Sequence, residues 1–583
     1  MLDSITHEPF YVRDVVDLDR QGLHVGWTGH GGPFPDGMPL VLTGNWGFAV
    51  VTGQVFGTPS DLLERTTPEY WSSIAEQMAG DDVRFHDALG RLNGTFAGVV
   101  ADARSGYCAI FTDRYGIQRL FHHHSSDGVF FATEAKAILA AVSATRHFDP
   151  VGLGEFLACG CTLGRRSLYR DIEVLPGAGF QRFTLHQSSP VHRYFDRSEW
   201  EQLQGQLTVP EATSRYIDAF AQTARRFLPA STSVAMSLTG GLDSRMVLAA
   251  AGAEPGRLPC YTFRGPYRDS YDVIVARHVA ASADQPFHPI TVGKDFIRDA
   301  PAYFERAVHL SDGYLGMSGA PELFANGVAR TLGTVRLTGN YGSETLRGSR
   351  AVGVDAQRGT AAAPDLHGHI HEAGHSFRSI VASMPPLSFA VFHQAPHHGF
   401  GRLAVEASQV VPRSPFLDND LLRVCYEAQR ALDGTSIAIE TLRESAPQLL
   451  DLPTDRGLLG SGGKVTRWMR RLHREMLFKG EYLASHGMPD AIARRRTLRA
   501  LTGMERRLLG RHKFYHLRSL LRDSLEGYTR DLLSSANLPE WVDAGRVREL
   551  MDEHYSDRRN HTAILDILLT LTQAQRGLLA RFM

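Results

Sequence analysis

The fold is decided by the run Ser233-Val-Ala-Met-Ser-Leu-Thr-Gly-Gly-Leu-Asp-Ser-Arg-Met-Val-Leu-Ala-Ala250. Residues 234–238 form a short apolar run of the kind that builds buried parallel strands. Gly240 and Gly241 permit a sharp turn and a close approach of the backbone to a ligand. A helical pattern begins at Leu242. Because a helix N-terminus carries unpaired N–H groups and a partial positive charge, this turn predicts a phosphate site.

The motif lacks the spacing of the dinucleotide fingerprint and the Gly-Lys-Ser/Thr ending of the P-loop. It is similar to the PP-loop of the N-type ATP pyrophosphatases, with Thr239 in the usual serine place. The resemblance implies that ATP is cleaved between its α and β phosphates and that Mg²⁺ is bound by the carboxylate of Asp243. The ATP contacts that it implies are Leu238, Thr239, Gly240, Gly241, Asp243 and Ser244. The alternative on the motif alone is an ordinary strand-to-helix turn.

The segments after this motif alternate between strand and helix patterns. Strands are expected at 258–263, 287–292 and 335–339, and helices at 201–227, 270–281, 295–310 and 320–332. This alternation predicts a doubly wound parallel sheet, whose ligands lie beyond the carboxyl ends of the strands. The segments 237–244, 262–264 and 338–344 should therefore meet there. The last two add Phe263, Thr338 and Gly339 to the expected ATP contacts.

Residues 1–200 are rich in short strand-like runs with turns between them. Strands are expected within 39–52 and at 96–102, 107–112 and 129–133, and helices at 70–80 and 85–92. This pattern is typical of an α+β domain built on antiparallel sheets.

Three motifs in this part resemble successive motifs of the class II glutamine amidotransferase domain of asparagine synthetases. They are Arg91-Leu-Asn-Gly-Thr-Phe-Ala97, Thr112-Asp-Arg-Tyr-Gly-Ile117 and Phe131-Ala-Thr-Glu-Ala-Lys136. The passage from Leu163 to Gly177 is similar to the family's exit from that domain. The resemblance implies two domains: an α/β-sandwich, Ntn-hydrolase-like domain over 1–200, and over 201–583 an asparagine synthetase-like ATP-pyrophosphatase domain with extra C-terminal helices.

The chain departs from that family at the glutaminase site. The family uses a cysteine exposed at its processed N-terminus, whereas this chain begins Met1-Leu-Asp-Ser4 and has its first cysteine at Cys108. The family's Asn-Gly-Glu-Ile-Tyr-Asn segment corresponds to Thr52-Gly-Gln-Val-Phe-Gly57, without either asparagine. An oxyanion donor alone is worth ~2.7–4 kcal/mol. We therefore expect no glutamine hydrolysis; Ser4 has no evident base that would make it a substitute nucleophile.

The segment Leu337-Thr-Gly-Asn-Tyr-Gly-Ser-Glu-Thr-Leu-Arg-Gly348 resembles the family's second ATP-site block. Ser343 falls at the family's aspartate, an expected Mg²⁺ ligand, and a neutral hydroxyl is a poor replacement for it. Glu344 matches the neighbouring glutamate. We therefore predict Glu344 as catalytic and as a metal ligand with Asp243; the alternative is a solvated helix-start residue.

Later segments supply cations and an expected ion pair. Arg456 stands where the family has a lysine that stabilises charge on the adenylate and pyrophosphate, and Lys464 follows in a glycine-rich loop. Both are predicted catalytic residues, although basic loop residues are usually only solvated. Arg413 and Asp418 lie in a block similar to the family's Arg-x-Pro-Phe-Leu-Asp and predict a structural ion pair.

Two biased stretches have bland interpretations. Residues 349–376, with histidines at 367, 369, 371 and 375, predict a loop or short helix over the active site, and a metal site is the weaker interpretation. The runs 122–124 and 397–398 predict surface turns. The arginine-rich stretch 465–522 predicts an amphipathic helix with a solvated basic side, with Trp468, Leu472 and Met476 on one face. The alternative is a surface for an acidic carrier protein or peptide.

Composition sets the remaining limits. The chain has 583 residues, 43% hydrophobic and 21% charged, with 62 Lys and Arg against 63 Asp and Glu. This balance offers no basic footprint for nucleic acid or an anionic membrane. With no signal-peptide pattern, no apolar run of ~20 residues and five scattered cysteines, we expect a soluble cytoplasmic protein with reduced thiols.

These features predict an AMP-forming ligase of specialised metabolism that adenylates a carboxylate and couples it to an amine, using ATP and Mg²⁺. Family members without a working glutaminase, such as β-lactam synthetases and lasso-peptide cyclases, use an internal amine. The alternatives are an asparagine synthetase using free ammonia or glutamine, a non-catalytic scaffold, and a PP-loop RNA-modifying enzyme. Expected partners are small-molecule or peptide substrates, with a carrier protein or a second copy left open.

Overall fold

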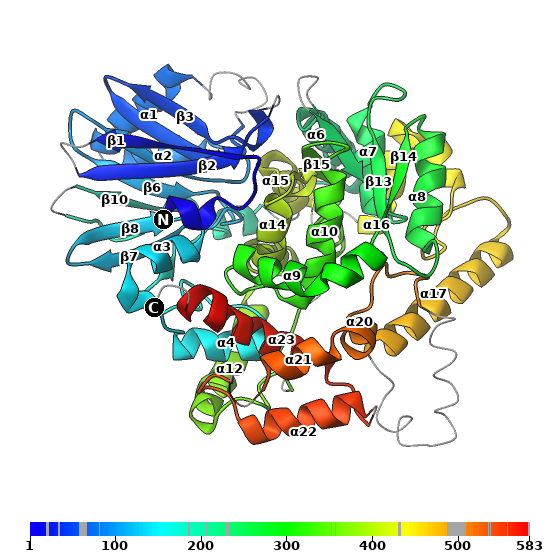
Figure 1. Cartoon of the computed structure of the whole chain (residues 1–583). Helices are drawn as coiled ribbons and strands as arrows, with labels where there is room; N and C mark the ends of the chain where they lie inside the picture. Colours follow the sequence, from blue (N-terminus) through cyan, green and yellow to red (C-terminus); the bar gives the residue numbers. More distant parts are fainter. Residues whose placement is uncertain are drawn as a thin grey trace.

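The fold is taken from a computed structural model of the whole chain (Figure 1). The structure describes all residues except 19–21, 33–34, 57–66, 81, 185–186, 204, 206, 229–232, 351, 356, 429–432, 487–508, 535, 537, 557 and 581–583.

The N-terminal part is built on antiparallel sheets, as the sequence predicts. A six-stranded sheet has the order β11-β10-β6-β5-β4-β3, a hairpin pairs β1 with β2, and β8, β7 and β9 form a third sheet. The expected pairing of 96–102 with 107–112 is confirmed, with Val99 opposite Ile110. The strands are β1 Tyr11–Leu18, β2 Leu23–His30, β3 Leu40–Gly44, β4 Gly47–Gly53, β5 Phe96–Asp102, β6 Cys108–Thr112, β7 Phe121–Ser125, β8 Gly128–Ala132, β9 Glu173–Val174, β10 Gly179–Phe183 and β11 His192–Arg193.

Helices α1 (Pro68–Gly80) and α2 (Asp82–Gly90) cover one face of the six-stranded sheet (Figure 1). Trp71, Ile74 and Met78 of α1 are fully buried, and Trp71 stacks on Phe111 of β6 with ring centroids 5.9 Å apart. The alternating strand faces and the apolar stripe of α1 thus form the core that the sequence pattern predicts.

The second part contains a parallel sheet with the order β14-β13-β12-β15-β16. Its strands are β12 Val234–Ser237, β13 Cys260–Arg264, β14 Phe287–Thr291, β15 Val335–Thr338 and β16 Val411–Arg413. The helices between them are α7 Leu242–Ala251, α8 Tyr271–Ser282, α9 Lys294–Leu310 and α10 Ala320–Ala329. If the five strands are numbered by their order in the chain, their order across the sheet is 3-2-1-4-5. The direction of this order reverses between β12 and β15, and doubly wound sheets bind their ligands at such a point. The predicted α/β fold class is confirmed.

Two boundaries differ from the sequence interpretation. The helix expected over 201–227 is α6, Val209–Arg226, because Thr208 and Glu211 form a capping box that starts it. The strand β16 was not predicted, since it has three residues, one of them Pro412.

The ion pair predicted between Arg413 and Asp418 is wrong. Arg413 pairs with Asp36 of the N-terminal part, with a 2.9 Å N–O distance, and Asp418 pairs with Arg226 at 2.7 Å. Asp418 also accepts a hydrogen bond from the side chain of Asn93 at 3.2 Å. Both residues therefore help to join the two parts of the chain.

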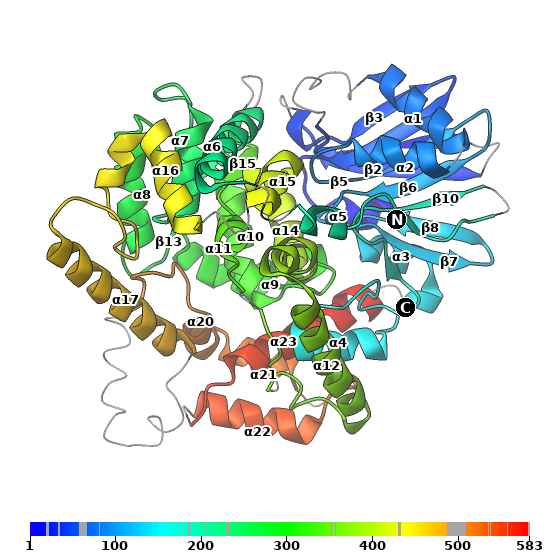
Figure 2. The same ribbon diagram turned by 180° about the vertical axis from the view of Figure 1, so that it is seen from behind.

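The remaining helices surround these sheets. Helices α21, α22 and α23 lie beneath them, with α23 beside α4, and α20 lies next to α17 (Figures 1 and 2). They are α3 Ala135–Ala141, α4 Pro150–Cys159, α5 Ser198–Glu201, α11 Gly342–Arg347, α12 His367–Ser383, α13 Pro386–Phe389, the π-helix η8 Ala390–His398, α14 Phe400–Ala407, α15 Asn419–Ala428, α16 Gly434–Ser445, α17 Lys464–His486, α20 Leu517–Ser524, α21 Glu526–Leu532, α22 Ala544–Tyr555 and α23 Thr562–Ala574. None of the helices among the described residues is long and apolar enough to cross a membrane.

The structure corrects three interpretations of histidine-rich segments. Residues 367–375 begin the 17-residue helix α12, which packs on α4 instead of lying over the sheet edge. Residues 122–124 belong to strand β7, and His122 and His123 are buried. Residues 397–398 end the π-helix η8 and are partly buried. A run of histidines carries no periodicity of its own, so it gave no signal for these elements.

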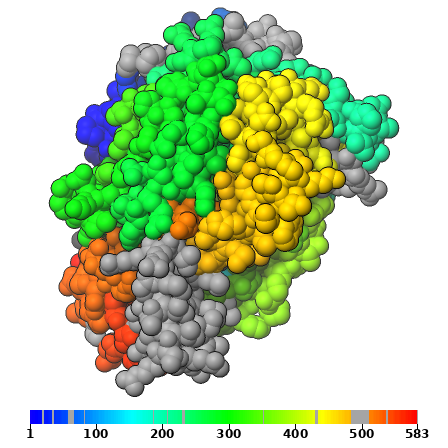
Figure 3. Space-filling model, turned by 90° about the vertical axis from the view of Figure 1, so that its right-hand side faces the viewer, coloured from blue at the N-terminus to red at the C-terminus, as the bar shows by residue number. Residues whose placement is uncertain are grey.

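The helix α17 reverses the expected orientation of its two faces. Trp468 and Met476 are 63% and 65% exposed, whereas Arg470 and Arg474 donate hydrogen bonds to the backbone carbonyls of Leu459 and Thr454. Seen from the side in Figure 3, the segment that includes α17 (gold) lies on the molecular surface. The arginines at 494–496, 499 and 506–507 lie outside the described residues.

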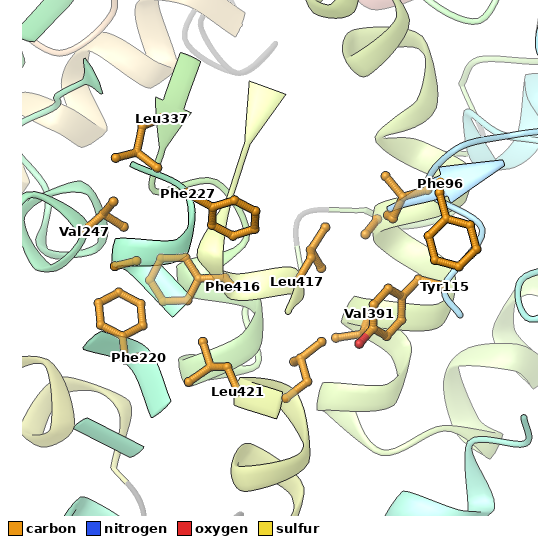
Figure 4. Close-up of a cluster of buried hydrophobic side chains, with 14 of the residues drawn as sticks. Phe96, Tyr115, Phe220, Phe227, Val247, Leu337, Val391, Phe416, Leu417 and Leu421 are labelled. Carbon is orange, nitrogen blue, oxygen red and sulfur yellow. The ribbon is translucent and has the colours of Figure 1, made fainter. Parts of the chain in front are cut away.

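One hydrophobic cluster crosses from the first part of the chain into the second. Phe96 and Tyr115 belong to the N-terminal part, and Figure 4 shows them facing Leu417 and Leu421 beside the parallel sheet. The same cluster continues to Leu337 of β15. The two parts therefore share a core, which fixes the position of one relative to the other.

Candidate active site

The PP-loop connects the central strand β12 to helix α7, as predicted. The N-cap residue of α7 is Gly241, which has no side chain to bind the first amides of the helix. These N–H groups are therefore left for a ligand, and the helix dipole favours an anion there. The hydroxyls of Thr239 and Ser244 lie 3.0 Å apart, so threonine keeps a hydroxyl at the expected serine place.

The second predicted segment lies directly against this loop. Ser237 of β12 is opposite Thr338 of β15, and a Cβ on Gly339 would lie 2.5 Å from the backbone nitrogen of Ser244. Only glycine allows this approach of two backbones. Tyr341, two residues later, has φ +71°, a left-handed conformation that costs ~1–3 kcal/mol and is found mainly at functional sites.

Phe263 lies near the carboxyl end of β13, with its ring 5.3 Å from that of Phe514. The hydroxyl of its neighbour Thr262 donates a hydrogen bond to the carbonyl oxygen of Leu238 in the PP-loop. The expected ATP contacts from β12, β13 and β15 thus come from neighbouring strand ends.

The carboxylate of Asp243 has partners that the sequence did not indicate. One guanidinium nitrogen of Arg347 lies 2.8 Å and 2.6 Å from its two oxygens, and the Ser343 hydroxyl donates to it at 2.8 Å. Burial raises the pKa of the nearby Glu344. Arg347 follows Ser343 by one turn of α11, so the spacing was visible, but nothing in the sequence showed which carboxylate it would reach.

Two further carboxylates border the PP-loop and were also missed. Asp272 accepts a hydrogen bond from the Gly240 amide at 2.8 Å, and the Asp455 amide donates to the Gly240 carbonyl oxygen at 3.0 Å. Burial first, and the neighbouring Asp455 second, raise the pKa of Asp272 to about 7. Burial also raises the pKa of Asp455. Asp272 is in the first turn of α8, after a strand end, and the rule for strand ends would have found it.

The two predicted catalytic cations have different surroundings. Arg456 follows Asp455 at the loop, where its guanidinium lies 3.8 Å from the centre of the Phe478 ring and 3.6 Å from Glu475. Lys464 is exposed at the start of α17. The loop before Arg456 is held by the buried Arg245 of α7, which donates hydrogen bonds to the carbonyl oxygens of Leu449, Leu452 and Pro453. Arg456 is thus the better positioned of the two.

A cavity of about 790 Å³ lies between the two parts of the chain. It is lined by Met1 and Leu2, by strands of the N-terminal sheets, and by Thr338 and Asn340 at the edge of the parallel sheet. It is large enough for a small substrate.

The magnesium site predicted from Asp243 and Glu344 does not fit this arrangement. Both oxygens of Asp243 already bind Arg347, and a guanidinium at this position would repel a divalent cation. A hard cation requires free carboxylate oxygens, and Ser343 offers only a hydroxyl.

Comparison with known proteins agrees with this architecture. Residues 83–195 match the family described as glutamine amidotransferase domain, and residues 215–399 match the family described as asparagine synthase. These ranges lie on either side of residue 200, although the predicted domain boundary stays a prediction.

Two curated relatives are similar to part of the chain. Asparagine synthetase [glutamine-hydrolyzing] 3 of Bacillus subtilis (strain 168) is 27% identical over 205 residues, covering 34% of this chain and 32% of the relative. Asparagine synthetase [glutamine-hydrolyzing] of Cricetulus griseus is 26% identical over 210 residues, covering 34% and 35%. The chain thus spans about a third of the length of these relatives. The chain therefore carries a glutamine amidotransferase domain followed by an asparagine synthase domain, and it is similar to asparagine synthetases.

Proposed function

We propose that this protein is an ATP-dependent, AMP-forming amide synthetase that adenylates a substrate carboxylate and couples it to an amine, without hydrolysing glutamine. One observation carries the proposal. The PP-loop, the Thr338–Gly339 strand end and the Asp455–Arg456 loop meet at the point where the strand order reverses. This is where a doubly wound sheet binds a nucleotide.

Activation of the acid needs charge stabilisation on the leaving pyrophosphate. The substrate carboxylate attacks the α phosphate of ATP, and the bond to the bridging oxygen of pyrophosphate breaks. The uncapped first amides of α7 and the guanidinium of Arg456 supply positive charge at the loop. Lys464 is the second candidate cation. No step here uses a metal, because Asp243 and Glu344 do not fit a magnesium site in this arrangement.

Amide formation then requires a neutral amine and a proton acceptor. The amine attacks the acyl carbon, AMP leaves with the bonding electrons, and the amine loses a proton. Glu344 is the proposed acceptor, since its raised pKa makes it a stronger base than an ordinary carboxylate. Replacing Glu344 with Gln should lower the rate of amide formation more than the rate of ATP–pyrophosphate exchange. Equal losses would assign Glu344 to adenylation instead.

The cysteines support the absence of glutaminase chemistry. Burial raises the pKa of all five thiols, to about 12 for Cys108, Cys159, Cys260 and Cys425 and well above its usual range for Cys161. A nucleophilic cysteine needs a lowered pKa. We therefore expect no ammonia release when the purified protein is incubated with glutamine, and measurable release would refute this part of the proposal.

The test is ATP–pyrophosphate exchange over a panel of carboxylic acids, amino acids and peptides with acidic side chains. The expected result is exchange that depends on one class of acid, with AMP formed once an amine is added. Arg456→Gln should lower the rate of exchange. Its matched control is Arg467→Gln, on the exposed side of α17, which should leave the rate unchanged. Exchange by none of the acids would refute the proposal.

Two alternatives have an observation in their favour. The curated relatives are named asparagine synthetases, which favours asparagine formation from aspartate; an assay with aspartate and ammonium decides this. The pairing of Asp243 with Arg347 favours a non-catalytic scaffold, which would bind no ATP in equilibrium dialysis. The RNA-modifying alternative has only the motif, because the chain carries no net basic charge.

A further inference from the structure

A cluster of histidines lies on a rare type of helix, away from the PP-loop. The π-helix η8 spans Ala390–His398 and includes His393, His397 and His398. Because a π-helix bonds residue i to residue i+5, His393 and His398 are one turn apart and share a face. Their ring centroids lie 5.8 Å apart. π-helical segments are rare and are frequently found at functional sites.

A buried cysteine completes this cluster from another element. Helix α4 ends at Cys159, and the next residue, Gly160, has a φ of +78° that turns the chain so that Cys161 follows in a buried position. Its Sγ lies 3.3 Å from Nε2 of His398. The ligand atoms of Cys161, His393 and His398 all lie within 4.8 Å of one another, and no other group of three His, Cys, Asp or Glu residues in the described part of the chain is this close.

The surroundings of His393 suit ligation. His393 is 3% exposed, and its Nε2 atom is buried without a hydrogen-bond partner. Such an orphaned polar atom is costly unless something binds it. Phe377 and Phe389 pack against His393, which excludes water from this side.

Charged groups surround Cys161. The guanidiniums of Arg119 and Arg358 lie near it, as does the carboxylate of Glu155. Arg119 is fixed by a 3.0 Å hydrogen bond to the carbonyl oxygen of Pro396 in η8, and Glu155 is paired with Arg166. One thiolate with two neutral imidazoles gives a ligand set of charge −1.

We propose that Cys161, His393 and His398 form a binding site for a thiophilic metal ion, Zn²⁺ or Cu⁺. Thiolate and imidazole are the ligands that both ions prefer, and three protein ligands leave a fourth position. His393 also lines a cavity of about 410 Å³, together with His397. Binding breaks the S–H bond of Cys161, forms the S–metal bond and releases one proton to the buffer. The two guanidiniums favour Cu⁺, which makes the site neutral.

The experiment uses the full-length protein, stripped with a chelator and then loaded with Zn²⁺ or, anaerobically, with Cu⁺. Bound metal is counted by mass spectrometry after gel filtration, and Co²⁺ serves as a spectroscopic probe of thiolate ligation. We expect about one equivalent of one of these ions, a Co²⁺ charge-transfer band and proton release on binding. Which ion binds distinguishes zinc from copper.

Three variants test the ligands. Cys161→Ser and His398→Gln should each weaken binding by ~100-fold or more and remove the Co²⁺ band or shift it. Cys425→Ser, which changes another buried thiol outside the cluster, should bind as the wild type does. If Cys161→Ser fails to fold, His398→Gln decides. Absence of all three ions from the wild type, or equal binding by wild type and both ligand variants, would overturn the proposal.

Discussion

Gly339→Ala should damage the ATP site while leaving the rest of the fold in place. The new Cβ would lie 2.5 Å from the backbone nitrogen of Ser244 and 2.8 Å from the carbonyl carbon of Asp243. These are backbone atoms at the start of α7, so no flexible side chain can move aside. The strand end and the PP-loop must therefore separate.

The size of the effect follows from that distance. Ordinary van der Waals contact begins near 3.4 Å, so the two backbones must move apart by about 1 Å. A misplacement of ~1 Å can cost a reaction ~100-fold, and inserting a methyl group into a packed region costs ~1–3 kcal/mol of stability. We therefore expect ATP–pyrophosphate exchange to fall ~100-fold.

Two quantities are measured for each variant: the rate of ATP–pyrophosphate exchange and the midpoint of thermal unfolding. Gly368→Ala is the matched control, because a Cβ there meets no atom within 4 Å. It should keep full exchange and equal or slightly higher stability, since alanine favours a helix more than glycine. Wild-type exchange by a folded Gly339→Ala protein would refute the inference that this contact positions the nucleotide.

Three further predictions concern charged groups. Arg347→Met frees the carboxylate of Asp243 and should therefore increase the affinity of the ATP site for Mn²⁺, measured by electron paramagnetic resonance. Because the pair is partly exposed, the free energy of unfolding should fall by only ~1 kcal/mol. Unchanged Mn²⁺ affinity would contradict the assignment. Lys136→Met should lower the free energy of unfolding in urea by ~3–5 kcal/mol, because it leaves the fully buried Asp312, 3.0 Å away, without its cation. The double variant Lys136→Met with Asp312→Asn should recover part of this loss. A wild-type unfolding midpoint for Lys136→Met alone would refute the prediction. Asp272 has its pKa raised from 3.8 to about 7, so the folded state binds this proton more tightly than the unfolded state does, and its penalty to folding is full above pH 7 and is relieved as pH falls towards 4. Relative to Asp272→Asn, the wild type should therefore gain thermal stability between pH 8 and pH 5, and parallel pH profiles would count against a buried, proton-binding Asp272.

Much of the fold could be predicted because its signals are local. The run 234–250 contains an apolar strand, two glycines and a helical pattern, and each part has the predicted structure. The convergence of strand ends also follows from a general rule, which predicts Thr338 beside the loop. The antiparallel pairing of β5 with β6 was visible for the same reason, as two apolar runs separated by a short turn.

The pairings between distant residues could not be predicted. Arg413 had an acid five residues away and instead binds Asp36, because the partner of a long side chain depends on the packing of whole domains. The same holds for Arg347 with Asp243. The sequence pattern of α17 predicts a buried apolar face, but Arg470 and Arg474 face inward instead. They bind backbone carbonyl oxygens of a preceding loop, and the spacing of residues along the helix carries no information about that loop.

The shared core gives the amidotransferase-like part of the chain a structural role beside any chemistry. Phe96 and Tyr115 complete a hydrophobic cluster that reaches β15, while Asn93 and Asp36 bind side chains that precede and follow the Pro415–Leu417 turn. Removing residues 1–200 would expose apolar side chains of this cluster. It would also remove the partner of Arg413 and one partner of Asp418. This structural role would hold the amidotransferase-like part in place independently of any reaction that it catalyses.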